Sequence, residues 1–331
     1  MATRAKSRNA PTGPSPFAIA DRLALKPEKF TDPLVTADGS DRASVSLDNL
    51  DTLWLNTGTL CNLACAGCYI ESSPTNDALV YLTAQEANRF YDEIATSGRN
   101  VREIGFTGGE PFMNPHFLPM LEEALQRGFE VLVLTNAMKP MRRHEAALLA
   151  LRERFGSKLT LRVSIDHHTQ QAHEGERGSN SWQPMIDGLQ WLSANGFSIA
   201  AAGRSVAGEE MAAARAAYGA LFAEKHIAID CSDPALLTLF PEMDESADVP
   251  EITTACWGIL GKLPSDIMCA SSRMVVRRKG EDRARVVACT LLPYDPGFDL
   301  GDSLAEADQD VPLNHPHCAR FCVLGGASCS A

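Results

Sequence analysis

The sequence predicts an α/β protein, an open or partial barrel with a small cysteine-rich C-terminal extension. Short apolar segments alternate with amphipathic segments whose apolar residues recur with a helical period. Parallel strands need long crossover connections and bury both faces, so we expect one sheet covered by helices. The alternation stops after about Asp233, where the extension begins.

The expected elements are six strands with five helices between them. Strands are predicted at 52–56, 101–106, 130–134, 159–165, 197–202 and 226–230, and helices at 83–97, 115–127, 141–155, 183–195 and 208–224. Thr83 and Glu86 have the spacing of a capping box at the first helix. Gly128 and Gly196 occupy positions typical of helix C-caps.

Three segments are expected along the chain. Residues 1–49 form an irregular, partly disordered extension with no periodic pattern, 50–235 form the barrel core, and 236–331 form a linker and a cysteine-rich domain. In the last segment, the extended runs 271–276 and 283–288 flank Lys279-Gly280-Glu281-Asp282, which predicts a hairpin. That hairpin would bring Cys269 and Cys289 together at its open end.

Composition excludes several classes of protein. The chain has 331 residues, 45% of them hydrophobic, with a net charge of −12. This excludes a disordered chain, a collagen-like fibre and a disulfide-stapled mini-domain, and argues against an anionic nucleic-acid or membrane partner. No apolar segment approaches the roughly 20 residues of a membrane span, and no signal core is evident. We therefore expect a cytoplasmic protein with neither nucleic-acid nor membrane partners.

The ten cysteines are the most informative residues. In a cytosolic chain, clustered cysteines indicate metal ligation or thiol chemistry before disulfides. Cys61, Cys65 and Cys68 directly follow the first expected strand, and three thiolates this close can converge on an iron–sulfur cluster. Either a remote cysteine supplies a fourth ligand, or one iron stays open to bind something else. A structural zinc site is the alternative.

Short motifs also follow the next expected strands. Gly108-Gly109-Glu110-Pro111 ends the second strand, Leu134-Thr135-Asn136 the third and Ser164-Ile165-Asp166 the fourth. In α/β folds, reactive groups lie at the C-terminal ends of the strands. Together with the C-x3-C-x2-C spacing in CNLACAGCY, these motifs resemble the radical S-adenosylmethionine (SAM) superfamily over roughly residues 50–231. The resemblance implies a partial (β/α)6 TIM-like barrel.

The resemblance implies an enzyme that abstracts a hydrogen from its substrate. Cys61, Cys65 and Cys68 would hold three irons of a [4Fe-4S] cluster, and SAM would chelate the fourth. Reductive cleavage of SAM would then give a 5′-deoxyadenosyl radical. An electron donor such as flavodoxin or ferredoxin is expected, with a small-molecule or peptide substrate. The short N-terminal extension favours the small molecule slightly.

The resemblance also implies roles for individual residues around SAM. Missing Cβ atoms would let the backbone of Gly108 and Gly109 approach the methionine ammonium, to which Glu110 supplies the opposite charge. Many family members carry an aromatic residue at the position of Gly67, so Tyr69 is expected to contribute to the adenine surface instead. The expected SAM-binding residues are Tyr69, Gly108, Gly109, Glu110, Asn136, Ser164 and Arg177. Candidate catalytic residues are Asp166, His167 and Cys231, with His168 interpreted as a polar rim and Cys231 alternatively as a buried small hydrophobe.

The later cysteines resemble the auxiliary-cluster extensions called SPASM or twitch domains. The spacing is C-x3-C-x6-C at the end of the chain, where C-x2-C-x5-C is typical. A cubane needs about four thiolates, so we expect one auxiliary [4Fe-4S] cluster, with zinc as the alternative. Its expected ligands are Cys269, Cys289, Cys318 and Cys322, with Cys256 and Cys329 as replacements or additions.

Two other functions remain open from the sequence. One is an enzyme similar to the GTP-processing cyclases of molybdenum cofactor biosynthesis, which end in a Gly-Gly pair, whereas Gly325-Gly326 is internal here. The other is a noncatalytic zinc or iron–sulfur scaffold, which would have no use for Gly108 to Glu110.

Overall fold

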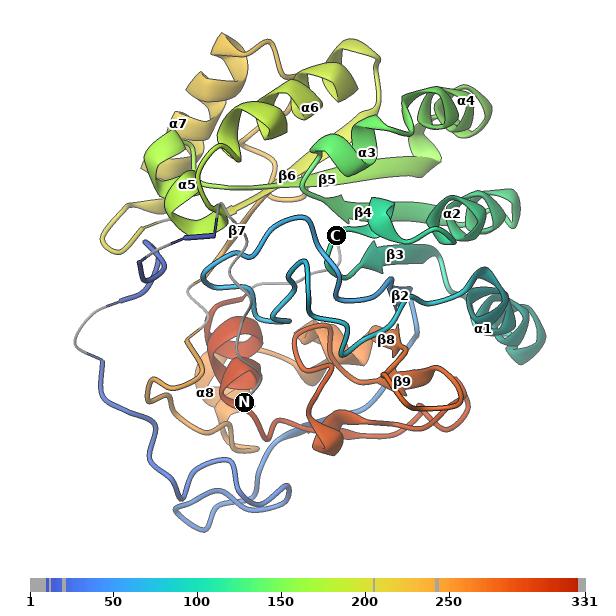
Figure 1. Ribbon diagram of the computed structural model, residues 1–331. Coiled ribbons are helices and arrows are strands. Elements are labelled where there is room, and N and C mark those ends of the chain that lie inside the picture. Colours follow the sequence, from blue (N-terminus) through green and yellow to red (C-terminus); the bar gives the residue numbers. More distant parts are fainter. Residues whose placement is uncertain (1–9, 12, 20–21, 205, 242–243, 327–331) are drawn as a thin grey trace.

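An eight-stranded sheet forms the centre of the protein. The computed structural model describes residues 10–11, 13–19, 22–204, 206–241 and 244–326. Its sheet has the strand order β7-β6-β5-β4-β3-β2-β8-β9 (Figure 1). The pairs are parallel except β8 with β9. The strands are β2 (Thr52–Asn56), β3 (Glu103–Thr107), β4 (Glu130–Thr135), β5 (Leu159–Asp166), β6 (Ser198–Arg204), β7 (Leu237–Phe240), β8 (Ser272–Val276) and β9 (Arg285–Val287).

Helices connect the parallel strands and lie along the outer side of the sheet (Figure 1). They are α1 (Ala84–Ser97), α2 (Phe117–Gln126), α3 (Lys139–Arg142), α4 (Glu145–Phe155), α5 (Gln170–Arg177), α6 (Trp182–Ala194) and α7 (Met211–Glu224), with α8 (Cys256–Leu260) in the C-terminal region. From β2 to β7 the strands stand in chain order, as in a partial (β/α)6 barrel. The predicted α/β class and parallel sheet are confirmed.

Most predicted elements agree with the structure to within a few residues. The Thr83 capping box at α1 is confirmed, and both Gly128 and Gly196 have the positive φ expected after a helix. The helix predicted at 141–155 is divided into α3 and α4. Helix α5 was not predicted, because it is short and mostly polar and so has a weak apolar pattern.

The predicted sixth strand at 226–230 is wrong. Ile227 and Ile229 are buried, which gives the segment a strand-like alternation. Their amides instead bond locally: the Ile227 amide donates to the Phe222 carbonyl at the end of α7, and the Ile229 amide donates to the Ile227 carbonyl. The position beside β6 is taken by β7, whose Leu237 and Leu239 are buried.

The predicted C-terminal hairpin is confirmed, and it also extends the main sheet. Met274 pairs with Val287 in the antiparallel hairpin of β8 and β9. Strand β8 in addition pairs in parallel with β2, with Thr52 opposite Ser272. The last part of the chain is therefore hydrogen-bonded to the strand that leads into the cysteine loop.

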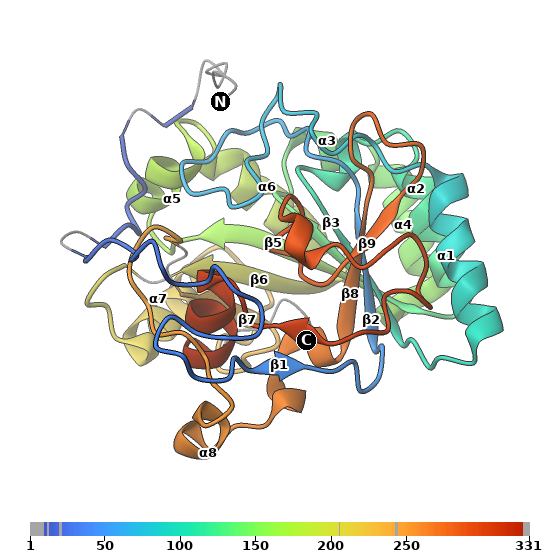
Figure 2. The same cartoon turned by 90° about the horizontal axis from the view of Figure 1, so that it is seen from below.

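The two ends of the described chain run along the same side of the molecule (Figures 1 and 2). Strand β1 (Ser44–Val45) pairs with β10 (Val311–Pro312), and bridges join Ala24 to Ala247 and Arg42 to Thr253. Phe17 is 2% exposed. The division of the chain at residues 49 and 235 stays a prediction.

The core lies on both faces of the parallel strands. All five residues of β2 and all five of β3 are buried. Phe117 on α2 packs edge-on against Phe106 on β3, with ring centroids 5.3 Å apart. Burying apolar surface stabilises the fold by about 25 cal/mol per Å². This burial fixes the register of these strands and hence the positions of their C-terminal ends. No helix among the described residues is long and apolar enough to span a membrane.

We expect acid to destabilise the fold through His173. Its side chain is fully buried on α5, with Nδ1 2.5 Å from the Ile165 carbonyl oxygen, and burial together with Arg177 lowers the pKa of His173 to about 4. Between about pH 6.5 and 4 the unfolded chain binds a proton that the folded chain does not, so stability falls as pH falls, by up to about 1.4 kcal/mol per unit. Denaturant unfolding at pH 7 and 5.5 should show a smaller pH dependence for His173→Gln than for the wild type. An unchanged difference would contradict the assignment, and exposed His226→Gln is the control.

Candidate functional site

The C-terminal ends of the parallel strands surround one cavity of about 140 Å³. The loop after β2 supplies the three clustered cysteines, and β3 to β7 each supply at least one lining residue. The cavity is lined by Cys61, Cys65, Cys68, Tyr69, Ile70, Ser72, Thr107, Gly108, Gly109, Leu134, Thr135, Asn136, Ser164, Asp166, Glu176, Arg177, Ala202, Arg204 and Phe240. Most of the residues predicted for the cluster and SAM therefore lie around one space.

The two glycines after β3 hold the start of the cysteine loop. The Gly109 amide donates to the Gly58 carbonyl at 2.8 Å, and the Glu110 amide to the Leu60 carbonyl at 3.2 Å. A Cβ atom on Gly109 would lie 2.2 Å from the Leu60 carbonyl oxygen, and one on Gly108 would lie 2.6 Å from that of Gly58. These glycines are thus required for close approach of the loop leading to Cys61, a reason that differs from the predicted approach to SAM.

The Glu110 carboxylate forms hydrogen bonds within the protein. Its carboxylate is 1% exposed and accepts hydrogen bonds from the Thr135 hydroxyl and the Asn136 amide, each at 2.9 Å. Burial raises the pKa of Glu110 to about 7. Glu110 is absent from the cavity lining among the described residues and joins the ends of β3 and β4. Its predicted contact with the SAM ammonium stays a prediction.

Of the three cysteines in the loop, Cys61 is buried and Cys65 and Cys68 are half-buried. Burial, reinforced by the charge of Glu110, raises the pKa of Cys61 to about 12, and burial also raises the pKa of Cys65 and Cys68. The Leu63 amide donates to Cys61 Sγ at 3.4 Å. A bound metal would be needed to keep such thiols deprotonated, so this donor set fits an iron–sulfur cluster.

Asn136 and Arg177 line the cavity but also have partners in the protein. The Asn136 side-chain amide donates to Asn62 Oδ1 at 2.9 Å, which ties β4 to the cysteine loop. Arg177 Nε donates to Asp166 Oδ2. Tyr69 and Ser164 line the cavity as predicted, and Tyr69 is 38% exposed.

Asp166 is the centre of a buried charge network. Burial opposes its ionisation, but Arg177 and Arg204 outweigh this and hold the pKa of Asp166 below its ordinary value. Arg204 Nε lies 3.7 Å from Asp166 Oδ1, and Arg204 Nη2 lies 3.9 Å from Glu176 Oε1. Two carboxylates and two guanidinium groups thus lie together at the edge of the cavity.

Sequence reasoning missed Glu176 and Arg204. The Gly67 amide donates to Glu176 Oε1 at 2.7 Å, and a Cβ atom on Gly67 would lie 3.0 Å from the same oxygen. This contact accounts for a glycine before Cys68. The other oxygen, Glu176 Oε2, is buried and accepts no hydrogen bond within the described chain, so it suits a positively charged or donating ligand. Extending the predicted fifth strand by two residues would have identified Arg204.

His167 and Cys231 lie outside the cavity lining. His167 follows Asp166 but faces Glu209, with Nε2 3.4 Å from Glu209 Oε2. Cys231 was predicted to end the sixth strand, but that strand is β7, and Phe240 from β7 lines the cavity instead. Cys231 is buried, and its carbonyl accepts from Arg215 Nη1 at 2.8 Å.

Four of the later cysteines surround a second, small cavity of about 20 Å³. They are Cys269, Cys289, Cys318 and Cys322, the four preferred auxiliary ligands. Cys318 and Cys322 lie on one turn of a π-helix (Cys318–Leu324). Burial and the nearby thiols of Cys289 and Cys269 raise the pKa of Cys318. Cys256 lies apart at the start of α8, where its Sγ accepts from the Thr253 amide at 3.4 Å. Cys329 lies outside the described residues.

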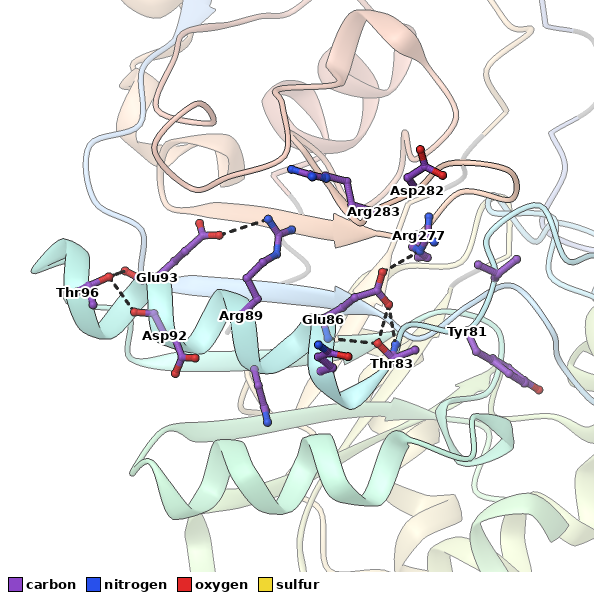
Figure 3. Close-up of a pocket in the computed structure, with 13 residues that line it drawn as sticks. Tyr81, Thr83, Glu86, Arg89, Asp92, Glu93, Thr96, Arg277, Asp282 and Arg283 are labelled. Carbon is purple, nitrogen blue, oxygen red and sulfur yellow. Dashed lines mark hydrogen bonds and ion pairs between the residues drawn. The ribbon is translucent and has the colours of Figure 1, made fainter.

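A larger surface groove of about 1,270 Å³ lies between α1 and the hairpin of β8 and β9 (Figure 3). Two ion pairs lie within it: Arg277 Nε lies 2.8 Å from Glu86 Oε1, and Arg89 Nη1 lies 3.6 Å from Glu93 Oε1. None of the predicted site residues lines it. The cavity at the strand ends is therefore the candidate functional site.

Fold and site together define an α/β protein with a cysteine-lined cavity at the strand ends, suited to an iron–sulfur cluster. A family model described as "Radical SAM superfamily" matches residues 55–237. The chain belongs to the radical SAM superfamily, a class of enzymes that use a [4Fe-4S] cluster and SAM.

The curated relatives resemble part of the chain. The antilisterial bacteriocin subtilosin biosynthesis protein AlbA of Bacillus subtilis is 31% identical over 140 residues, which are 42% of this chain and 30% of AlbA. The mycofactocin maturase MftC of Mycobacterium tuberculosis is 27% identical over 166 residues, which are 48% of this chain and 40% of MftC. The chain thus matches less than half the length of either relative.

Solved structures share the fold at low identity. A structure described as native anSMEcpe with bound AdoMet has a TM-score of 0.53 at 13% identity, over 81% of this chain and 82% of that one. SuiB of Streptococcus suis has a TM-score of 0.50 at 10% identity, over 75% of this chain and 62% of that one. These similarities extend the agreement in fold beyond the residues that the family model matches.

Proposed function

We propose that this protein cleaves SAM reductively at a [4Fe-4S] cluster and abstracts a hydrogen from a small-molecule or peptide substrate. The observation that carries the proposal is the cavity at the strand ends, where three thiols meet polar side chains from the neighbouring strands. Membership of the radical SAM superfamily supports the same chemistry. A flavodoxin or ferredoxin would supply the electron.

The residues that would hold the cofactors follow from the cavity. Cys61, Cys65 and Cys68 would ligate three irons, leaving the fourth for SAM. With SAM bound, the reduced cluster supplies a 5′-deoxyadenosyl radical. The Glu176 carboxylate and the Tyr69 ring would contact SAM, while Arg177 and Arg204 hold Asp166 ionised at the cavity edge.

We also propose an auxiliary [4Fe-4S] cluster between Cys269, Cys289, Cys318 and Cys322. Their shared cavity supports this assignment. A single zinc ion would need its thiolates about 3.8 Å apart. Within the described chain, no three cysteine thiols lie within 4.8 Å of one another, which favours a cluster over zinc at either cysteine site.

The two alternatives have less support. The comparisons do not favour a GTP cyclase-like molybdenum cofactor enzyme. A noncatalytic scaffold would leave the buried, unpaired Glu176 Oε2 beside the thiols without a role.

Anaerobic reconstitution tests the proposal. The wild type should contain about eight irons and eight sulfides per chain and form 5′-deoxyadenosine from SAM with dithionite. Cys318→Ala should lose about four irons, because its thiol is one of the auxiliary ligands, whereas half-buried Cys256→Ala should keep all eight. Equal iron in Cys318→Ala and the wild type would contradict the auxiliary cluster, and absence of 5′-deoxyadenosine from the fully loaded wild type would contradict the proposed function.

A further inference from the structure

Three side chains whose nitrogen and oxygen atoms could bind a metal ion lie beside the candidate active site, outside its cavity. His167 and His168 directly follow β5, and Glu209 directly precedes the N-cap of α7. His167 Nε2 lies 3.4 Å from Glu209 Oε2, and His168 Nδ1 lies 3.7 Å from Glu209 Oε1. The three ligand atoms all lie within 4.8 Å of one another, the one such group among the described residues.

Two of these three ligand atoms are buried and make no hydrogen bond with the described residues. His167 is 4% exposed, and neither His167 Nε2 nor His168 Nδ1 has a hydrogen-bond partner in the described chain. Buried polar atoms are rarely left unsatisfied. Both nitrogens are therefore candidates for binding a metal ion.

Aromatic side chains lie against the two imidazole rings. The ring of Phe17 lies 6.1 Å from that of His167, and Tyr218 lies 5.5 Å from His168, so aromatic rings border the group.

A second contact fixes the orientation of the His167 ring. The Thr169 amide donates to His167 Nδ1 at 3.1 Å, and Thr169 Oγ1 lies 2.8 Å from the same nitrogen. Because Nδ1 accepts from the amide, the neutral ring carries its hydrogen on Nε2, which a metal ion would displace on binding.

We propose that His167, His168 and Glu209 bind one divalent first-row transition-metal ion. Two imidazoles and a carboxylate form a known ligand set for such ions, with at least one coordination position left for water or another ligand. Two nitrogen or oxygen ligands of a tetrahedral zinc ion lie about 3.3 Å apart, so the observed distances require only small movements. The ion would join the end of β5 to the segment before α7. Its ligand His167 directly follows Asp166, which lines the candidate active site.

Zinc binding by the anaerobically reconstituted protein tests this site independently of SAM cleavage. Dialysis against Zn²⁺ followed by elemental analysis should give one zinc per chain in addition to the cluster iron. His168→Asn and Glu209→Gln should bind this zinc at least tenfold more weakly with unchanged iron content. Glu210→Gln is the matched control, because Glu210 is exposed and its side chain makes no capping bond.

Zinc K-edge absorption identifies the ligands. Nitrogen and oxygen neighbours at about 2.0 Å are expected, whereas sulfur at about 2.3 Å would assign the zinc to cysteines and overturn the proposal. Zinc uptake that is equal in the wild type and Glu209→Gln, or no zinc beyond background in the wild type, would also overturn it.

Discussion

A Cys65→Ala variant is expected to form no detectable 5′-deoxyadenosine after anaerobic reconstitution with iron and sulfide. Cys65 is one of three thiols that line the cavity at the strand ends, and the loop around it contributes no fourth cysteine. With two thiolates left, the cluster would lose a protein ligand while SAM still needs its own iron. The measurement is product formed from SAM with dithionite, alongside iron content.

Cys231→Ala is the matched control for Cys65→Ala. Cys65 lies in the loop after β2, whereas Cys231 lies between α7 and β7 and outside the cavity lining. This variant should keep the iron content and the SAM cleavage of the wild type. Retained cleavage in Cys65→Ala would remove the basis of the proposed function, and loss in Cys231→Ala would show that thiol loss anywhere disturbs the site.

Replacing Arg177 should affect both stability and SAM binding. Arg177 is paired with Asp166, and their side chains are 13% and 9% exposed. Removing one partner of a buried ion pair leaves an uncompensated charge and costs roughly 3–5 kcal/mol. We expect Arg177→Ala to lower the free energy of unfolding by about this amount and to weaken SAM binding at least tenfold, because the Asp166 carboxylate lines the same cavity.

Arg154→Ala separates this effect from the general loss of an arginine. Arg154 pairs with Glu122 at the surface, with side chains 48% and 41% exposed, and such pairs contribute about 0–1 kcal/mol. Denaturant unfolding and equilibrium SAM binding give the two measurements. If Arg177→Ala destabilised the protein no more than Arg154→Ala, the buried network would not contribute as we infer.

Much of the site could be predicted from the sequence, because reactive groups in α/β folds lie at the C-terminal ends of the parallel strands. Apolar runs gave five of the six barrel strands, and their ends carried Gly108, Asn136 and Ser164, all of which line the cavity. The thiols could be identified because cysteine spacing is a local property of the sequence. In a partial barrel, residues at the C-terminal ends of neighbouring strands lie close together, whichever side chains the rest of the strands carry.

Side-chain partners could not be predicted, because they depend on contacts between distant segments. Glu110 has the charge to bind an ammonium group, yet its carboxylate bonds to Thr135 and Asn136. The buried alternation of Ile227 and Ile229 imitated a strand, since burial alone does not reveal which backbone pairs in a sheet. Glu176 was missed because α5 has few apolar residues.

The pairing of β2 with β8 has a consequence for synthesis of the chain. Strand β2 leads directly to Cys61, but one of its two neighbours, β8, comes from residues 272–276. While the ribosome is still making the intervening residues, β2 has an open edge that invites pairing with other chains. The strand that leads to the cysteine loop therefore has both of its neighbours only after residues 272–276 have been made.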